Sequence, residues 1–102
     1  MRKNTMTMGL CAWIAVMTLA NPAGAGDADY GKSLASQCTS CHGPEGEGMG
    51  QNPPIAGMPE DEFIRRLSAF KSGERQSMMM GIMAKKLSDS DIADLAAYFA
   101  EQ

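Results

Sequence analysis

The sequence predicts a small all-α domain of about four short helices joined by one long loop. Apolar side chains recur at helical spacing in three separate segments, and no segment shows the alternating pattern of a β-strand. Residues typical of helix starts precede these segments, whereas Gly and Pro accumulate in one stretch between them. With 102 residues, the chain has room for one domain at most.

Residues 1–25 are expected to form a secretory signal peptide. Two basic residues near the start precede an uncharged apolar run, residues 10–20, and a small-x-small cleavage site ends at Ala25. A membrane anchor is disfavoured because a span takes about 20 apolar residues. A lipid-modified Cys11 is disfavoured because the apolar run follows this residue. We therefore expect a periplasmic product, residues 26–102, that is not embedded in the membrane.

The expected product is acidic and has few large apolar side chains. It contains seven Lys and Arg against twelve Asp and Glu, a formal charge of −5, which argues against a nucleic-acid partner. Its 77 residues, with three Phe, two Tyr, four Leu and four Ile, are close to the lower limit for a self-sufficient core. Its two cysteines lie in one pentapeptide, so we expect a bound group to add apolar volume.

The first expected helix, capped by Asp27 or Asp29, leads into this pentapeptide. Its apolar residues follow at i, i+4 and i+8: Tyr30, Leu34 and Cys38. The pentapeptide Cys38-Thr39-Ser40-Cys41-His42 reads C-x-x-C-H, the attachment signature of c-type haem. Two thiols at this spacing can add to the two vinyl groups of one porphyrin, and His42 can bind the iron. The sequence therefore predicts one covalently bound haem c and a function in electron transfer.

Other chemistries fit the pentapeptide less well. Zinc takes about four ligands, and Cys38, Cys41 and His42 supply three in the expected product. A thiol–disulfide protein is expected to have a βαβ pattern, which is lacking here. An enzyme or gas-binding haem protein would need an open sixth coordination position and a distal acid–base residue, and the chain has a single His.

The stretch 43–57 contains five Gly and three Pro, which exclude regular structure. A disordered linker is one interpretation. We favour an ordered loop around the haem, because the stretch starts at the expected iron ligand and ends in the apolar pair Ile55-Ala56. Ile55 would then pack against the porphyrin, and the carbonyl of Pro53 or a neighbour would accept the second ring N–H of His42.

Two amphipathic helices are expected in the second half of the chain. The first begins with Pro59 and three acidic residues, ends at Gly73, and carries an apolar stripe of Phe63, Ile64, Leu67 and Phe70. The second begins with the capping sequence 88–91 and is expected to pack across the first helix of the chain through Ile92, Leu95, Ala96 and Phe99.

Between these helices, four Met lie within six positions: Met78, Met79, Met80 and Met83. A methionine cluster is most often adaptable core filler. Here a second role is expected, because a haem with one His ligand needs a sixth ligand, and a thioether suits the iron.

Together these motifs resemble class I cytochromes c. The chain is most similar to the cytochrome subunit of flavocytochrome c sulfide dehydrogenase and to single domains of periplasmic dihaem cytochromes c. The likeness rests on the haem motif with Gly43 and, more weakly, on four later stretches: residues 53–56, 70–74, 80–85 and 97–99. It departs from the dihaem proteins because one haem motif is present.

The resemblance implies thioether bonds at Cys38 and Cys41, His42 as proximal ligand, Met80 as distal ligand, and a Pro53 carbonyl that orients His42. Rival distal ligands are Met79 and then Met78, followed by Met83 and Met58. It also implies a carrier without catalytic residues that passes electrons to a redox acceptor protein. The donor would be a sulfide-oxidising flavoprotein, with the chain as its haem subunit. The alternative is a free-standing carrier of another respiratory or photosynthetic chain.

Overall fold

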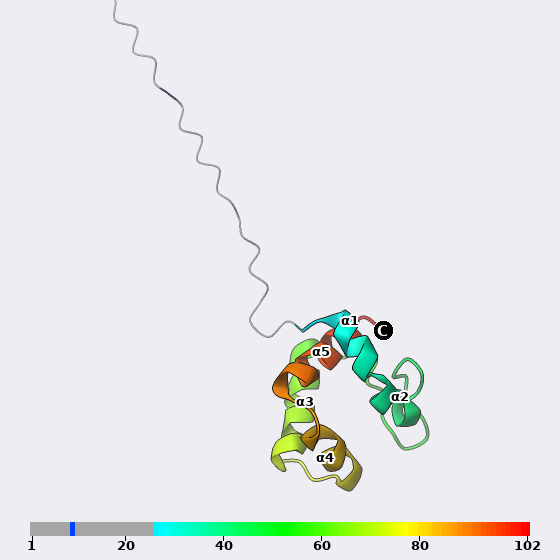
Figure 1. Cartoon of the computed structure of the whole chain (residues 1–102). Helices are drawn as coiled ribbons and strands as arrows, with labels where there is room; N and C mark the ends of the chain where they lie inside the picture. The colour runs from blue at the N-terminus through cyan, green and yellow to red at the C-terminus, as the bar shows by residue number, and fades with distance from the viewer. Residues whose placement is uncertain (1–8, 10–25) are drawn as a thin grey trace, which may run out of the picture.

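The computed structural model describes residue 9 and residues 26–102, so the expected signal peptide lies outside the described residues except for Gly9. Five helices follow one another in the described part of the chain (Figure 1): α1 Ala28–Leu34, α2 Ser36–His42, α3 Glu60–Ser72, α4 Met78–Lys85 and α5 Asp89–Ala100. No strand forms among residues 26–102, where the β-type pairing is one isolated bridge between Met49 and Asn52. The expected all-α class is confirmed.

About four helices were expected, and the described part of the chain has five. The first expected helix is divided at Ala35 into α1 and α2. Ala35 keeps helical backbone angles, but its N–H bonds the carbonyl of Lys32, three residues back instead of four. This tighter turn ends α1 and starts α2, and no Gly or Pro in the sequence marks it.

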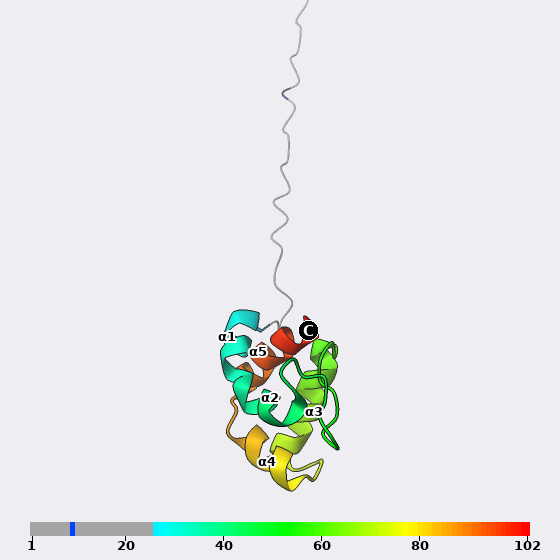
Figure 2. The same ribbon diagram turned by 90° about the vertical axis from the view of Figure 1, so that its right-hand side faces the viewer.

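The core lies where α5 packs against α1 and α3. Phe99 of α5 stacks on Phe63 of α3, with ring centroids 5.7 Å apart. At the crossing with α1, Gly31 lies against the backbone of Asp94, and the Asp94 carboxylate accepts the N–H of Asp27 at 2.7 Å. The expected packing of the last helix across the first is thus confirmed. In both views α4 lies at the opposite end of the molecule from α1 and the C-terminus (Figure 2).

Helix ends follow the sequence signals. Asp27 caps α1, and a capping box joins Ser88 to Asp91 at the start of α5. Pro59 precedes α3, and Gly73 ends it in the left-handed conformation with φ 82°. These predicted boundaries are confirmed, because each depends on side-chain chemistry within one turn.

The loop between α2 and α3 is ordered by its own backbone hydrogen bonds. The carbonyl of Gly46 accepts the N–H groups of Ile55 and Ala56 at 2.7 and 2.9 Å, and that of His42 accepts the N–H of Gly48 at 2.6 Å. Gly46 has φ 82° and lies under the ring of Phe99, where a Cβ would come within 2.9 Å of it. The ordered loop is therefore confirmed, and the alternative of a disordered linker is wrong.

Candidate functional site

A cavity of about 1020 Å³ opens between α2, the loop, α3 and α4. Its volume is at the upper end of the range of small-molecule sites, roughly 300–1,000 Å³. Much of its wall is apolar, with the largest side chains from the loop and α3: Ile55, Phe63, Leu67 and Phe70. Phe63 and Phe70, two members of the expected apolar stripe of α3, therefore contact both the core and this cavity.

Cys38 and Cys41 line the cavity from α2, where a separation of three residues puts them on the same face of the helix. Burial, with a smaller contribution from the neighbouring Cys41, raises the pKa of the Cys38 thiol to about 11. A charged thiolate is therefore disfavoured at this position. A thioether carries no charge, so the surroundings of Cys38 suit covalent attachment to an apolar macrocycle.

His42, the last residue of α2, is buried and lines the same cavity. Its Nδ1 lies 2.7 Å from the carbonyl oxygen of Pro53. A carbonyl can only accept, so Nδ1 carries the proton and donates it to Pro53. Nε2 then holds the free lone pair needed to bind a metal, and the loop fixes the orientation of the ring.

Asn52 provides a second tie between the loop and α2 that sequence reasoning missed. Its side-chain amide donates to the carbonyl of Cys41 at 3.0 Å. Carbonyls in the last turn of a helix have no hydrogen-bond partner within the helix, and this bond gives one of them a partner. It also holds the segment before Pro53 against the haem motif. Only its place next to Pro53 could have indicated this role.

Methionines from α4 form another part of the wall. Met79, Met80 and Met83 line the cavity together with Met58 from the loop. Met80 is half-buried and packs on the core, whereas Met79 is 64% exposed and Met78, 84% exposed, does not line the cavity. Ser77 fixes this turn, because its hydroxyl accepts the N–H of Met80 at 3.3 Å.

Three cations on the wall were also missed by sequence reasoning. Arg66, Arg75 and Lys86 line the cavity, and the guanidinium of Arg75 lies over the Phe70 ring at 5.0 Å. The wall thus presents two thiols, one oriented imidazole, thioethers, apolar surface and cations. This donor set suits an iron porphyrin with acidic side groups. In the described part of the chain, no group of three or more His, Cys, Asp and Glu residues is placed to hold a metal ion.

Over residues 28–102 the sequence matches the family model of cytochrome c. The chain belongs to the cytochrome c family. Its cofactor is haem c, and its fold is that of class I cytochromes c. Within the described residues no helix is both long and apolar enough to cross a membrane.

Relatives include both longer and equally short proteins. The chain is 36% identical to cytochrome c4 of Pseudomonas aeruginosa, over 97% of this chain and 49% of that protein. It is 37% identical to cytochrome c-554(548) of Halomonas halodenitrificans, over 76% of this chain and 99% of that protein. A solved thiosulfate dehydrogenase of Marichromatium purpuratum is similar with a TM-score of 0.71 and 34% identity, over 80% of this chain and 20% of that one.

The chain spans about half the length or less of the cytochromes c4 that it matches. Cytochrome c-554(548) shows that a protein of this type can also consist of little more than the matched region. The comparisons support the family and electron transfer. They do not show the expected similarity to the haem subunit of sulfide dehydrogenase.

Proposed function

We propose that this cytochrome c carries electrons in the periplasm from a dehydrogenase that oxidises an inorganic sulfur compound. The observation that carries the proposal is the pairing, in one cavity, of an oriented imidazole at His42 with the half-buried thioether of Met80. With both residues as ligands, the iron would have no coordination position left for a substrate. A site of this kind exchanges electrons and makes no bonds with a substrate.

In this proposal Cys38 and Cys41 would hold the haem by thioether bonds, and Nε2 of His42 and the sulfur of Met80 would bind the iron. When bound, the haem supplies a one-electron couple between Fe(II) and Fe(III). The Pro53 carbonyl keeps His42 in one tautomer, and a thioether ligand raises the reduction potential. The apolar part of the wall would limit the access of water to the iron, which would favour the less charged ferrous state.

Two different sulfur-oxidising dehydrogenases are candidates for the electron donor. The resemblance noted from the sequence favours a sulfide-oxidising flavoprotein, with this chain as its haem subunit. The similarity to a solved thiosulfate dehydrogenase favours a thiosulfate-oxidising enzyme instead. A free-standing carrier of another respiratory or photosynthetic chain is the alternative to both.

Purification of the tagged protein from its native periplasm tests the donor. A larger flavoprotein that co-purifies and reduces the haem when sulfide is added supports the subunit. A lone monomer contradicts the subunit. Stopped-flow mixing of the monomer with thiosulfate dehydrogenase and thiosulfate then tests the thiosulfate-oxidising enzyme as donor. Rapid reduction of the haem supports this donor, and no reduction excludes it.

A further inference from the structure

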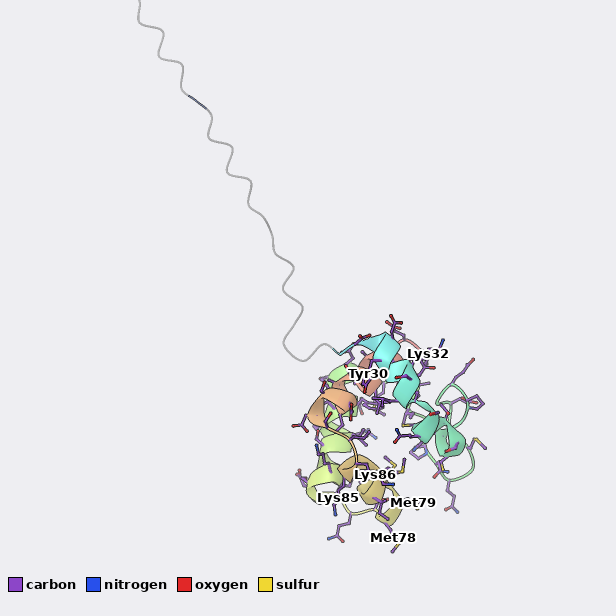
Figure 3. All side chains as sticks on the ribbon, viewed as in Figure 1. Tyr30, Lys32, Met78, Met79, Lys85 and Lys86 are labelled. Carbon is purple, nitrogen blue, oxygen red and sulfur yellow. The ribbon has the colours of Figure 1, made fainter. Side chains whose placement is uncertain are left out.

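A buried carboxylate lies outside the haem site, where α1 crosses α5. Asp94 of α5 is 9% exposed, and its Oδ1 accepts the N–H of Asp27 at 2.7 Å. Figure 3 shows Tyr30 and Lys32 of α1 far from the labelled side chains of α4. The residues that line the haem cavity come from neither α1 nor α5. The burial of Asp94 therefore needs an explanation other than haem binding.

Within residues 26–102, no side-chain cation forms an ion pair with this carboxylate. The ion pairs there join Arg66 to Glu62 and Lys71 to Asp89. The first turn of α1 adds a further acidic group, Asp29. Because a buried charge is costly unless it is paired, this site needs a cation from another source.

The chain at Gly26 lies against the same part of α5. A Cβ at this position would clash with the carbonyl of Ala93 and crowd the backbone nitrogen of Asp94, so a glycine is required here. Covalent geometry keeps the nitrogens of Gly26 and Asp27 within about 3.7 Å of each other. The Gly26 nitrogen thus lies within about 6.5 Å of the Asp94 Oδ1 that binds the next N–H.

Removal of the expected signal peptide gives this nitrogen a charge. Hydrolysis of the peptide bond between Ala25 and Gly26 consumes one water molecule. Ala25 becomes the carboxylate end of the released peptide, and the amide nitrogen of Gly26 becomes an α-amino group. An α-amino group is largely protonated at neutral pH, whereas the amide before cleavage is neutral. Cleavage at this bond therefore creates a cation beside Asp94.

We propose that Asp94 is the docking site for the ammonium group that cleavage creates at Gly26, and that this ion pair fixes α1 on α5 in the processed protein. The pair goes beyond electron transfer, because it acts on maturation of the fold. It strengthens the crossing that holds α1, the helix that leads into the haem motif. Cleavage one residue away displaces the ammonium by about 3.8 Å, so the site also selects the bond that is cut.

The amino end of the exported protein is the first test. Intact-mass spectrometry of the holoprotein, produced from the full-length gene, is expected to give residues 26–102 with one haem and an unmodified amino end. A product that begins at another residue, or one with a blocked amino end, overturns the proposal.

Titration of the amino group tests its charge partner. The 13Cα resonance of Gly26 in the ferrous holoprotein reports protonation, and the Asp94 carboxylate is expected to raise the pKa of this ammonium above its ordinary value. Asp94→Asn keeps an oxygen for the Asp27 N–H but removes the charge, and is expected to lower the midpoint by about one pH unit. The other nearby carboxylates, Asp27 and Asp29 on α1 and Asp91 on α5, stay unchanged in this variant.

The matched control is Asp29→Asn, which makes the same change in net charge at an exposed carboxylate of α1. It is expected to move the Gly26 midpoint much less, because an exposed charge is screened by solvent. Equal midpoints in the parent and in Asp94→Asn overturn the proposal, as does an equal change in the two variants.

A second amino end tests the stabilisation. Gly-Ser-Gly-Ser inserted between Ala25 and Gly26 carries the ammonium away from α5. In urea, at about pH 6.5, this extension is expected to raise the unfolding equilibrium constant about tenfold in the parent and in Asp29→Asn, but less than about twofold in Asp94→Asn. An equal effect of the extension in all three backgrounds overturns the proposal. If the extended chain fails to fold, the titration with the native end decides.

The pH dependence has a definite sign. A raised pKa of the Gly26 ammonium means that the stabilisation is complete at low pH and is lost as the pH rises through that pKa. At about pH 10 the two amino ends of the ferrous protein are therefore expected to differ less than about twofold in unfolding constant. A tenfold difference that persists there overturns the proposal, because it would come from the extension itself.

Discussion

At the scale of single residues, His42 connects the haem motif to the rest of the molecule. It ends α2, lies buried beside both cysteines, and donates from Nδ1 to the Pro53 carbonyl 2.7 Å away. One hydrogen bond thus couples the loop to the orientation of the proposed iron ligand. The role of Pro53 was predictable from the resemblance, and the structure has the expected contact.

Replacement of Met80 by Ala tests the proposed distal ligand. The variant is expected to lose the thioether-to-iron charge-transfer band of the oxidised protein and to have a lower reduction potential, because a thioether ligand raises that potential. Met79→Ala, which removes a more exposed thioether from the same helix, is the control and is expected to keep the band. A band that survives in Met80→Ala and vanishes in Met79→Ala would assign the ligand to Met79.

Gly46→Ala is expected to destabilise the loop. The new Cβ would lie 2.9 Å from Phe99 and 3.0 Å from Ile55, at a backbone angle that L-residues rarely adopt. Strain and overpacking together are expected to cost about 2–4 kcal/mol in a thermal unfolding experiment. Gly50→Ala, also at positive φ but in open space, is expected to cost about 1 kcal/mol. Equal losses would show that the contact with Phe99 does not matter.

At the scale of helices, sequence patterns predicted where helices start and end. They did not predict whether an expected helix would be continuous. Ser88 with Asp91, and Gly73, act within one turn of chain and could be identified directly. The division at Ala35 could not, because it depends on a change in backbone hydrogen bonding that no side chain signals. Arg75 was missed for a related reason: its place over Phe70 depends on how the chain turns back after Gly73.

Gly31→Ala is expected to disturb the crossing of α1 and α5. A Cβ there would clash with the Asp94 carbonyl and approach the Cβ of Tyr98 within 2.9 Å, so the helices would have to separate. We expect a loss of about 1–3 kcal/mol in unfolding free energy, measured with denaturant. Ser33→Ala, on the exposed side of the same helix, is expected to stay within about 0.5 kcal/mol of the parent. A neutral Gly31→Ala would contradict the close packing.

At the scale of the whole molecule, the fold encloses a cavity that its own side chains do not fill. Short length, few large apolar residues and the absence of a disulfide framework in residues 26–102 predicted that a bound group must complete the core. The cavity between α2, the loop, α3 and α4 agrees with that prediction.

Without haem attachment the domain is expected to lose its stable fold. Cys38→Ser/Cys41→Ser, exported in the same way, would leave the apolar cavity wall uncovered. We expect weak helical circular dichroism and no cooperative thermal transition, whereas Ser40→Ala, an exposed change on the same helix, should behave like the parent. A cooperative transition in the double Ser variant would show that the polypeptide core suffices.

Spectroelectrochemical titration of the purified holoprotein, with and without carbon monoxide, tests the central claim most directly. The proposed pair of axial ligands, His42 and Met80, predicts one reversible one-electron transition whose ferrous spectrum carbon monoxide leaves unchanged at neutral pH. Formation of a carbon monoxide complex by the native ferrous protein would reveal an open coordination position. That result would contradict a pure electron carrier and favour a gas-binding or catalytic haem protein.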